Sequence, residues 1–201
     1  MAIVRLEQSD LNTAAEALSR AFLQDPLQRY VLPDESERLR LSPHHFRPVL
    51  NYGLKFGEVF TTSGVPQGAA VWLPPGETNV TEERASEAGL DRISNDLGEQ
   101  AAGRFFSVLE FLDPFHVADA KDPHWYVMVV GVDPSSQGQG LGRAILQPIL
   151  DRADAGRHSC YLETAQPDNV GFYQYLGFRV VREIVEPTSG LSLWTFKREA
   201  A

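Results

Sequence analysis

A glycine-rich loop between an apolar strand and a helix is the segment of this sequence best suited to bind a ligand. It reads Gln137-Gly138-Gln139-Gly140-Leu141-Gly142 and follows the apolar run Trp125 to Val132. Glycines let a backbone approach a ligand closely and adopt conformations closed to other residues. The free amides of the next helix's first turn, at the positive end of its dipole, favour an anion. The loop therefore predicts a site for a phosphate or pyrophosphate group.

The glycine spacing separates this loop from two other phosphate-binding loops. A dinucleotide-binding Rossmann fold carries G-x-G-x-x-G, whereas the glycines here fall at 138, 140 and 142. A Walker loop needs Gly-Lys followed by Ser or Thr, and this segment has neither. Both nucleotide-binding readings are therefore rejected.

The elements around the loop are those of an α/β protein. Trp125 to Val132 is apolar almost throughout, as is typical of a central strand covered on both faces. Gly140 to Ala155 has apolar residues at helical spacing, and Pro148 inside it predicts a kink. Beyond it we expect a strand at 159–164, a short helix at 168–176, and strands at 178–185 and 191–197.

The upstream half favours the same class. Asp10 is expected to open a helix that Asp25-Pro26 ends, and Pro43 and Pro48 should interrupt or kink a second helix from Glu35 to Tyr52. The remaining segments are a strand at 2–6, a hairpin over 56–73, helical sequence over 80–113 and a polar connection over 113–123. The order β-α-α-β-β-α-β-α-β-α-β-β predicts one domain over residues 1–201 with a mixed parallel and antiparallel sheet.

The charge of the chain restricts its partners. The formal net charge is −9 and the pI is about 5.0. This argues against non-specific binding of nucleic acid, which needs basic patches, and is compatible with a cationic amine substrate. No signal peptide and no apolar stretch of roughly 18 residues is visible, so we expect a cytoplasmic protein without a membrane partner.

A metal site is not expected. Cys160 is the only cysteine, so neither an intrachain disulfide nor a cysteine cluster can form, and its apolar surroundings predict a buried thiol. His44 and His45 are adjacent, point to different sides and lack carboxylates or cysteines at ligand spacing.

The loop resembles the signature of the GNAT acetyltransferase superfamily, Gln/Arg-x-x-Gly-x-Gly/Ala at a strand-to-helix junction. Gln137, Gly140 and Gly142 meet this pattern. A second family segment, an asparagine followed by (Leu/Phe)-Tyr-x-x-x-Gly-Phe, resembles Asn169 to Phe178. Two motifs in the expected order and spacing are more specific than one. The resemblance implies the GNAT fold, with a central mixed and splayed sheet flanked by helices, and acetyl-CoA as cosubstrate.

The family implies roles for individual residues. In GNAT enzymes the loop amides bind the pyrophosphate, and the preceding strand pairs with the two amides of pantetheine. The tyrosine of the second segment, here Tyr173, acts as general acid toward the leaving thiolate, and the asparagine, here Asn169, contacts pantetheine. The implied cofactor site comprises Val130, Gly131, Val132, Gln137, Gly138, Gln139, Gly140, Leu141, Gly142, Arg143, Asn169 and Tyr173.

A narrower resemblance concerns the acceptor. The stretch from Trp125 to Val185 is similar to the puromycin N-acetyltransferase branch, particularly at Leu162-Glu163-Thr164 and in both motifs. The Phe22-Asp25-Pro26 helix end and the Ala70-Val71-Trp72 strand also look similar. This branch includes antibiotic-resistance enzymes, and the resemblance does not establish puromycin as the acceptor.

The general base is open at the level of sequence. Some family members carry a glutamate eleven residues before the motif glutamine, and that position here is Tyr126. Glu163, on the strand beside the splay, is the candidate catalytic carboxylate, although it can equally serve a structural hydrogen bond. His116 can line the acceptor site, while surface exposure is the default for both His116 and His124.

The acceptor pocket of the family lies between the first two helices and the segment before the central strand. By analogy it nominates Phe22, Asp25, Tyr30, Trp72 and Glu110 as substrate-binding residues. Phe22 and Trp72 also lie on apolar faces typical of a core, and Asp25 before Pro26 is also typical of a turn.

The sequence therefore predicts an acetyl-CoA-dependent N-acetyltransferase of a small-molecule primary amine, without a metal. Two alternatives stay open, an enzyme that acetylates a protein or peptide and a non-catalytic acyl-CoA-binding module. Pairwise association is common in this fold, so a homodimer is compatible with the resemblance. The acceptor, the acyl-chain preference and the oligomeric state are not given by these residues.

Overall fold

One seven-stranded sheet organises the protein, whose computed structural model describes all 201 residues. Its strands lie in the order β1-β2-β3-β4-β5-β7-β6, and only the β4–β5 pair is parallel. The mixed sheet expected from the sequence is confirmed. The strands are β1 (Ile3–Arg5), β2 (Glu58–Thr62), β3 (Gly68–Leu73), β4 (Trp125–Val132), β5 (Cys160–Thr164), β6 (Arg179–Val185) and β7 (Ser192–Arg198).

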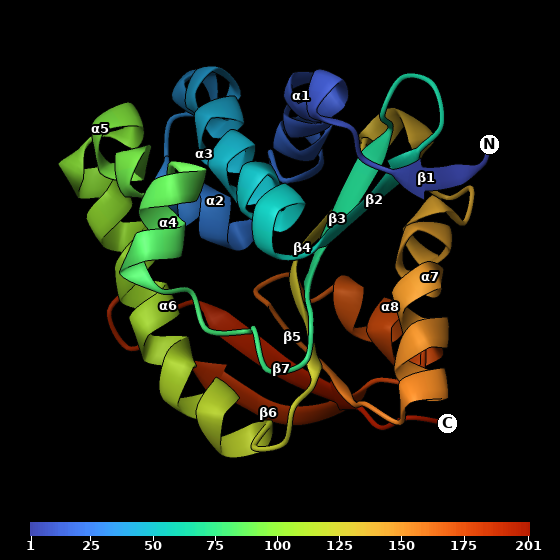
Figure 1. Cartoon of the computed structure of the whole chain (residues 1–201). Helices are drawn as coiled ribbons and strands as arrows, with labels where there is room; N and C mark the ends of the chain where they lie inside the picture. The colour runs from blue at the N-terminus through green and yellow to red at the C-terminus, as the bar shows by residue number, and fades with distance from the viewer.

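Helices cover both faces of the sheet (Figure 1). α7 and α8 pack on one face, over a core of sixteen buried residues that includes Trp72, Trp125 and Phe196. α1 and α3 pack on the other, over Val59 and Val71. The helices are α1 (Leu11–Ala21), α2 (Pro26–Val31), α3 (Glu35–Phe56), α4 (Glu82–Ala88), α5 (Ile93–Leu97), α6 (Glu99–Asp119), α7 (Leu141–Gly156) and α8 (Asn169–Tyr175).

The sequence predicts that the Asp25-Pro26 pair ends a helix, but in the structure the pair begins one. It opens α2: the Asp25 carboxylate accepts hydrogen bonds from the backbone N–H groups of Leu27 (2.9 Å) and Gln28 (3.2 Å). Pro26 occupies the first helical turn, where its missing N–H costs nothing. Because α1 already ends at Ala21, the pair marks the start of a helix and not the end of one.

Prolines were weaker helix breakers than predicted. α3 runs unbroken through Pro43 and Pro48, because its side chains Phe46, Val49 and Leu50 pack into the core under the helix. α6 likewise continues through Pro114 to Asp119, where a polar connection was expected from residue 113. This extension places the last turns of α6 over the sheet.

The central strand β4 is interrupted by a bulge. Val129 lies opposite Val71 and Val127 lies opposite Trp72, so Met128 has no partner on β3. On its other side β4 pairs with β5 only at Trp125 and Tyr126. A bulge bends a strand and redirects its side chains. From Val127 onward β4 therefore parts from β5, and its backbone is free on that side.

The strands β4 and β5 are followed by elements that surround this splay. α7 begins where β4 ends and α8 follows β5, on one side, whereas α2 and α6 lie on the other (Figure 1).

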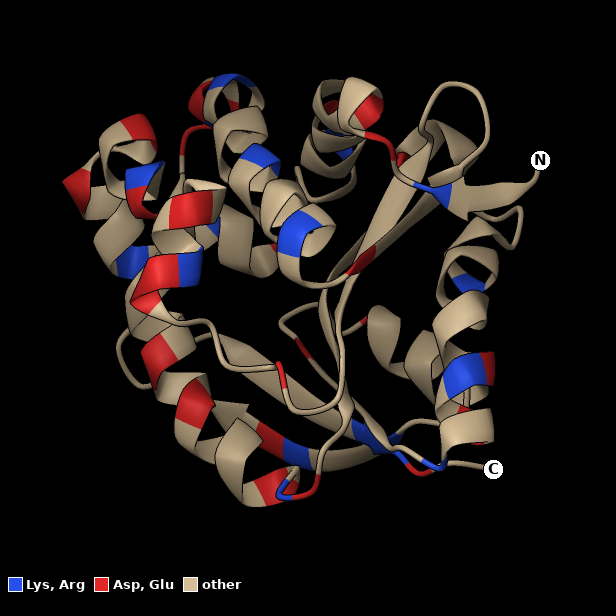
Figure 2. Ribbon diagram, viewed as in Figure 1, with Lys and Arg blue, Asp and Glu red and all other residues tan.

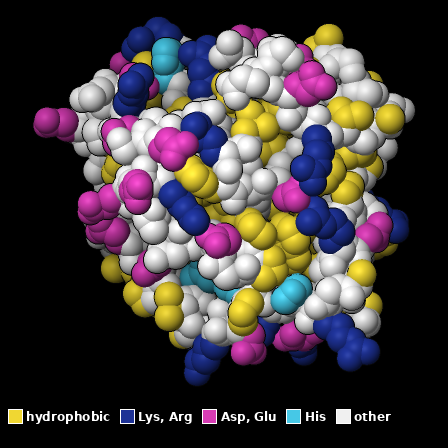
Figure 3. All heavy atoms as spheres, viewed as in Figure 1, with side chains coloured by type: hydrophobic (Ala, Val, Ile, Leu, Met, Phe, Trp, Pro, Cys, Tyr) yellow, Lys and Arg dark blue, Asp and Glu magenta, His cyan; other side chains and the backbone are white.

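None of the helices is long and apolar enough to cross a membrane. Figure 2 shows acidic residues distributed along α4, α5 and α6. Hydrophobic side chains gather in the middle of the face shown in Figure 3, between the α3–α4 side and α7.

Candidate active site

The loop between β4 and α7 presents a row of unpaired backbone donors. The N–H groups of residues 138–143 donate no hydrogen bond within the chain. Gly138 and Gly140 have φ angles of 75° and 76°, in the left-handed region that favours glycine, and Gly140 is the residue before α7. The unpaired donors lie at the positive end of the α7 dipole. These are the features that an anion site, as predicted from the glycine spacing, requires.

Side chains below the loop fix its path. Gln137 donates from Nε2 to the carbonyl oxygen of Val132 (3.0 Å). The Asp133 carboxylate accepts from the backbone N–H of Ser135 (2.9 Å) and from Arg20 on α1 (2.5 Å). The last β4 residue and the loop are therefore tied to α1, which leaves the loop amides free for a ligand.

The edge of β4 beside the loop is open enough to take a ligand. Val130, Gly131 and Val132 are only half-buried although β4 lies in the middle of the sheet. On the opposite face a side chain at Gly131 would meet Phe22 at 2.8 Å, so glycine allows the end of α1 to approach the strand. Phe22, a predicted acceptor residue, is half-buried at this contact and also packs on Phe46.

Tyr173 on α8 is buried, with 4% of its surface exposed. Its ring packs against the rings of Phe172, Phe178 and Phe196. Burial raises the pKa of Tyr173, and the negative charge of Asp25 adds to the shift. The phenol therefore holds its proton at neutral pH. Asn169 begins the same helix and is half-buried.

Asp25 acts on Tyr173 through its charge. Burial raises the pKa of Asp25 to about 6, although the two helix-capping hydrogen bonds oppose the shift. The negative charge of Asp25 in turn raises the pKa of Tyr173. A residue predicted for the acceptor pocket therefore influences the residue predicted to donate to the thiolate.

Glu163 belongs to a cluster of buried polar side chains at the point where β4 and β5 separate. Its side chain is 9% exposed. Because Tyr126 pairs with Tyr161 across the ladder, Glu163, two residues further on, faces the same side as both tyrosines. Burial raises the pKa of Glu163 to about 8, while the nearby Tyr126 hydroxyl opposes the shift. The residue at the position where some family members carry a glutamate therefore acts on a carboxyl group of the adjacent strand.

The extension of α6 brings His116 to this carboxyl group. Its Nδ1 atom lies 3.6 Å from Glu163 Oε1, and its ring stacks on Tyr161 with centroids 4.4 Å apart. Burial lowers the pKa of His116 to about 4, aided by the neighbouring His124. With the histidine neutral and the carboxyl proton retained to about pH 8, this contact is not an ion pair at neutral pH. His124 is buried, with 5% exposure, and not on the surface as expected.

The remaining predicted acceptor residues are dispersed. Tyr30 is half-buried and packs with α6 and with Ala165, just beyond β5. Glu110 is exposed on α6. Trp72 is fully buried in the core under α7, against Trp125, and so offers no surface to an acceptor. The prediction of Trp72 as a substrate-binding residue is therefore wrong, and the alternative prediction of a core residue is confirmed. The charge of Asp113 on α6 raises the pKa of both Glu163 and Tyr126. The sequence does not identify Asp113 as a site residue, because it predicts a polar connection from residue 113 onward.

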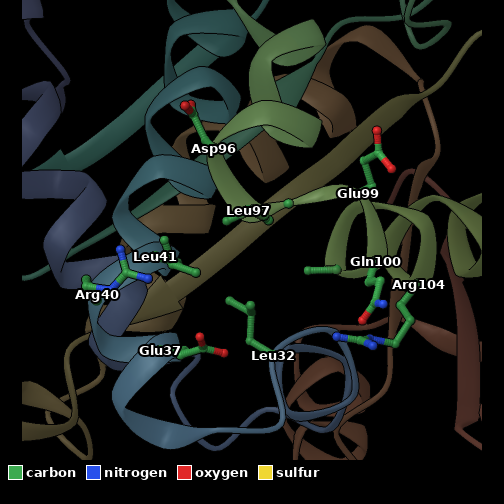
Figure 4. Close-up of a pocket in the computed structure, with 11 residues that line it drawn as sticks. Leu32, Glu37, Arg40, Leu41, Asp96, Leu97, Glu99, Gln100 and Arg104 are labelled. Carbon is green, nitrogen blue, oxygen red and sulfur yellow. The ribbon is translucent and has the colours of Figure 1, made fainter.

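A cavity of about 530 Å³ lies elsewhere, between α2–α3 and α5–α6 (Figure 4). Glu37, Arg40 and Asp96 line it, and so does Arg104, whose guanidinium is bonded to the carbonyl oxygen of Val31. None of its lining residues belongs to β4, β5 or the glycine loop. We assign the chemistry to the splay, because the unpaired amides and the buried carboxyl group lie there.

Comparison with known proteins agrees with this geometry. Residues 96–180 match the acetyltransferase (GNAT) domain. An uncharacterised N-acetyltransferase of Schizosaccharomyces pombe is 30% identical over 186 residues, which cover 89% of this chain and 74% of the relative. The chain belongs to the GNAT acetyltransferase superfamily. It is thus an acetyl-CoA-dependent acetyltransferase.

Solved GNAT structures show the same fold at low identity. One is a Corynebacterium glutamicum protein described as histone acetyltransferase HPA2 and related acetyltransferase, with a TM-score of 0.68, 22% identity, and coverage of 100% of this chain and 96% of that one. Another is arylalkylamine N-acetyltransferase 2 of Aedes aegypti, with a TM-score of 0.68, 16% identity, and coverage of 99% and 98%. GNAT enzymes use acetyl-CoA, and the six free loop amides and the open β4 edge fit its pyrophosphate and pantetheine.

Proposed function

We propose that this GNAT enzyme transfers the acetyl group of acetyl-CoA directly to a primary amine of a small molecule, with Glu163 as general base and Tyr173 as donor to the leaving thiolate. The observation that carries the proposal is the buried Glu163 carboxyl group below the β4–β5 splay. Once ionised, a carboxylate with a pKa of about 8 is a far stronger base than an ordinary one, and a general base works best with a pKa near the working pH.

The proton balance requires such a base. An amine enters as an ammonium ion, and its nitrogen must lose a proton before it can attack the thioester carbonyl. Attack forms the C–N bond, cleavage of the C–S bond releases the thiolate, and the nitrogen loses a second proton as the amide forms. One of the two protons ends on the thiol and the other goes to solvent. Glu163 takes the proton from the nitrogen in this scheme.

Tyr173 is suited to donate a hydrogen bond to sulfur. Its buried phenol keeps its proton, and its raised pKa exceeds the ordinary thiol pKa of about 8.5, so full proton transfer to the thiolate is uphill. The hydrogen bond alone lowers the energy of the developing negative charge. The acceptor's proton or water then completes the thiol.

A small acceptor is favoured by the helices that cover the site. Val108 and Leu112 on α6 pack with Ala165 beyond β5, and Leu27 and Tyr30 on α2 pack against the same cluster. Packing of α2 and α6 on this side of the sheet leaves less room for an acceptor, whereas a peptide needs an open groove. The resemblance to the puromycin N-acetyltransferase branch and the existence of an arylalkylamine enzyme with this fold support the same class.

A cationic acceptor is favoured by the charge around the pocket. Asp113 and Asp119 on α6 lie near enough to Glu163 to raise its pKa. Arg182 neutralises Asp119, but Asp113 has no ion-pair partner. A second negative charge beside the base attracts an ammonium group and disfavours an anionic acceptor.

The purified protein should be incubated with acetyl-CoA and a panel of small primary amines while free thiol is measured. The proposal predicts thiol release and acetylated product with cationic amines, and little with their anionic analogues. Acetylated peptides after incubation with cell extract, with no turnover of any small amine, would instead identify a protein acetyltransferase. Tight CoA binding with neither activity would identify a non-catalytic module.

A further inference from the structure

Two histidines lie in direct contact beside the proposed base. His116 Nε2 on α6 and His124 Nε2, in the turn before β4, are 2.8 Å apart. The other ring nitrogen of His124, Nδ1, lies 2.8 Å from the backbone carbonyl oxygen of Asp122. The other ring nitrogen of His116 faces Glu163 at 3.6 Å. The four groups form a line from the splay to the exposed Asp122.

The chemistry of these contacts fixes both tautomers. A carbonyl oxygen can only accept, so His124 Nδ1 must carry the proton. In neutral His124 the Nε2 atom is then the lone-pair acceptor, and His116 Nε2 must donate to it. Neutral His116 therefore has its lone pair on Nδ1, the atom that faces Glu163. The chain of hydrogen bonds orients a basic nitrogen into the active site.

We propose that His116 is a second proton acceptor of the active site and that His124 is the positioning residue that holds it in the basic tautomer. This inference rests on the proposed amine acetylation. The acceptor nitrogen gives a proton to His116 Nδ1, and His116 releases its Nε2 proton to His124 Nε2. One proton enters and one leaves His116, so its tautomer changes while its charge does not.

The proton then resides on His124 beside the surface. The charge of Lys197 opposes protonation of His124. His124 therefore gives up its Nδ1 proton to solvent on the side of the exposed Asp122, so that each imidazole takes up one proton and releases one. Proton transfer through a line of hydrogen-bonded groups also explains why two imidazoles are buried here without a carboxylate bonded to either ring.

The neighbours of His116 support a neutral resting state. Glu163, Tyr126 and Tyr161 face it from the sheet, and Asp113 and Asp119 share its helix. Asp119 is the one carboxylate whose charge favours protonation of His116, and it is held by two hydrogen bonds from Arg182 Nε and one from Nη2.

The test compares two variants at His124. In His124→Gln the side-chain oxygen can still accept from His116 Nε2, whereas in His124→Leu no acceptor is present. We expect both variants to lower kcat about tenfold, with the KM for acetyl-CoA unchanged, because neither side chain can take up the Nε2 proton of His116. The loss is smaller than the usual effect of a general acid or base because Glu163 remains. Only His124→Gln should keep the resting tautomer of His116. Thermal melts of both variants establish that they are folded.

The tautomers are measured independently by NMR of ¹⁵N-histidine-labelled protein at pH 7. The inference predicts His116 as the Nε2–H form and His124 as the Nδ1–H form, and loss of the His116 preference in His124→Leu. Equal kcat in folded wild type and His124→Leu, or His116 carrying its proton on Nδ1, would overturn the inference. An absence of any amine turnover by the wild type would contradict the proposed function instead, whatever the tautomers are.

Discussion

Tyr126 on β4 and Glu163 on β5 face the same side of the sheet where the two strands separate, and the Tyr126 hydroxyl lowers the pKa of the Glu163 carboxyl group. Tyr126 occupies the position at which some GNAT enzymes carry a glutamate. In the proposed mechanism the carboxyl group comes from the neighbouring strand instead, and the tyrosine adjusts its pKa.

Removal of the Tyr126 hydroxyl should change the titration of the base. Because the Tyr126 hydroxyl lowers the pKa of Glu163, Tyr126→Phe should raise that pKa further. The rising limb of kcat/KM should then shift to higher pH, and activity at pH 7 should fall by about three- to tenfold, as for the loss of one polar interaction with a charged group. Tyr161→Phe is the matched control, since Tyr161 faces the same side of the sheet but does not shift the pKa of Glu163. An unshifted limb in Tyr126→Phe would contradict the assignment.

Glu163 should reduce stability while it serves activity. In the unfolded chain its carboxyl ionises near 4.5, whereas the folded protein keeps the proton to about 8. Folding stability therefore falls as pH rises from about 4.5 and reaches its lower plateau above about 8. Glu163→Gln should remove this loss and raise Tm by roughly 3 to 8 °C at pH 8.5, with little gain at pH 5.

The measurement is a series of thermal melts from pH 5 to pH 8.5. Glu110→Gln, an exposed position on α6, should show no pH-dependent gain. A Glu163→Gln protein that melts at or below the wild-type temperature at pH 8.5 would show that the ionised Glu163 carboxylate does not destabilise the folded protein.

Tyr173→Phe should lower kcat about 10- to 100-fold, as for loss of one donor to a developing anion, with little change in the KM for acetyl-CoA. The kcat of the wild type should not fall near pH 10, because the pKa of the phenol is raised. Tyr175→Phe is the comparison: this ring is 71% exposed, and its kcat should stay unchanged. Equal losses in both variants would count against a specific donor role.

Gly140→Ala should weaken acetyl-CoA binding about tenfold, because a side chain at φ of 76° is strained and displaces the loop amides. Gly64→Ala is the matched control: Gly64 has φ of 77° in the β2–β3 turn, and a side chain at either glycine would meet nothing within 4 Å. Both variants carry a similar backbone cost, but only Gly140→Ala should change the Kd measured by calorimetry. Equal affinities would mean that the loop does not bind the cofactor.

The sequence was most informative where function depends on local backbone. The strand, loop and helix from Trp125 to Gly156 were predicted almost to the residue, because glycine spacing and an apolar run are local signals. The start of α2 was missed because Asp25-Pro26 fits both a helix end and a helix start. α6 was predicted to end near 113 because Pro114 looked like a breaker, and packing kept it helical.

The active-site polar group could be predicted only in part. Glu163 was identified as a candidate because it lies on the strand beside the motif. Its contact with His116 joins residues 47 positions apart and depends on the two extra turns of α6, which no local pattern specifies. The burial of His124 has the same origin, since it follows from packing against His116 and Tyr161.

The central claim, that Glu163 is the general base, is tested most directly by the pH dependence of kcat/KM. The acceptor should be an amine with a pKa below about 7, so that its own ionisation does not contribute above neutral pH. The account predicts that wild-type kcat/KM rises to a plateau with an apparent pKa of about 8, and that Glu163→Gln loses this limb and about 100-fold of the plateau rate. A Glu163→Gln enzyme with the wild-type limb and rate would contradict it.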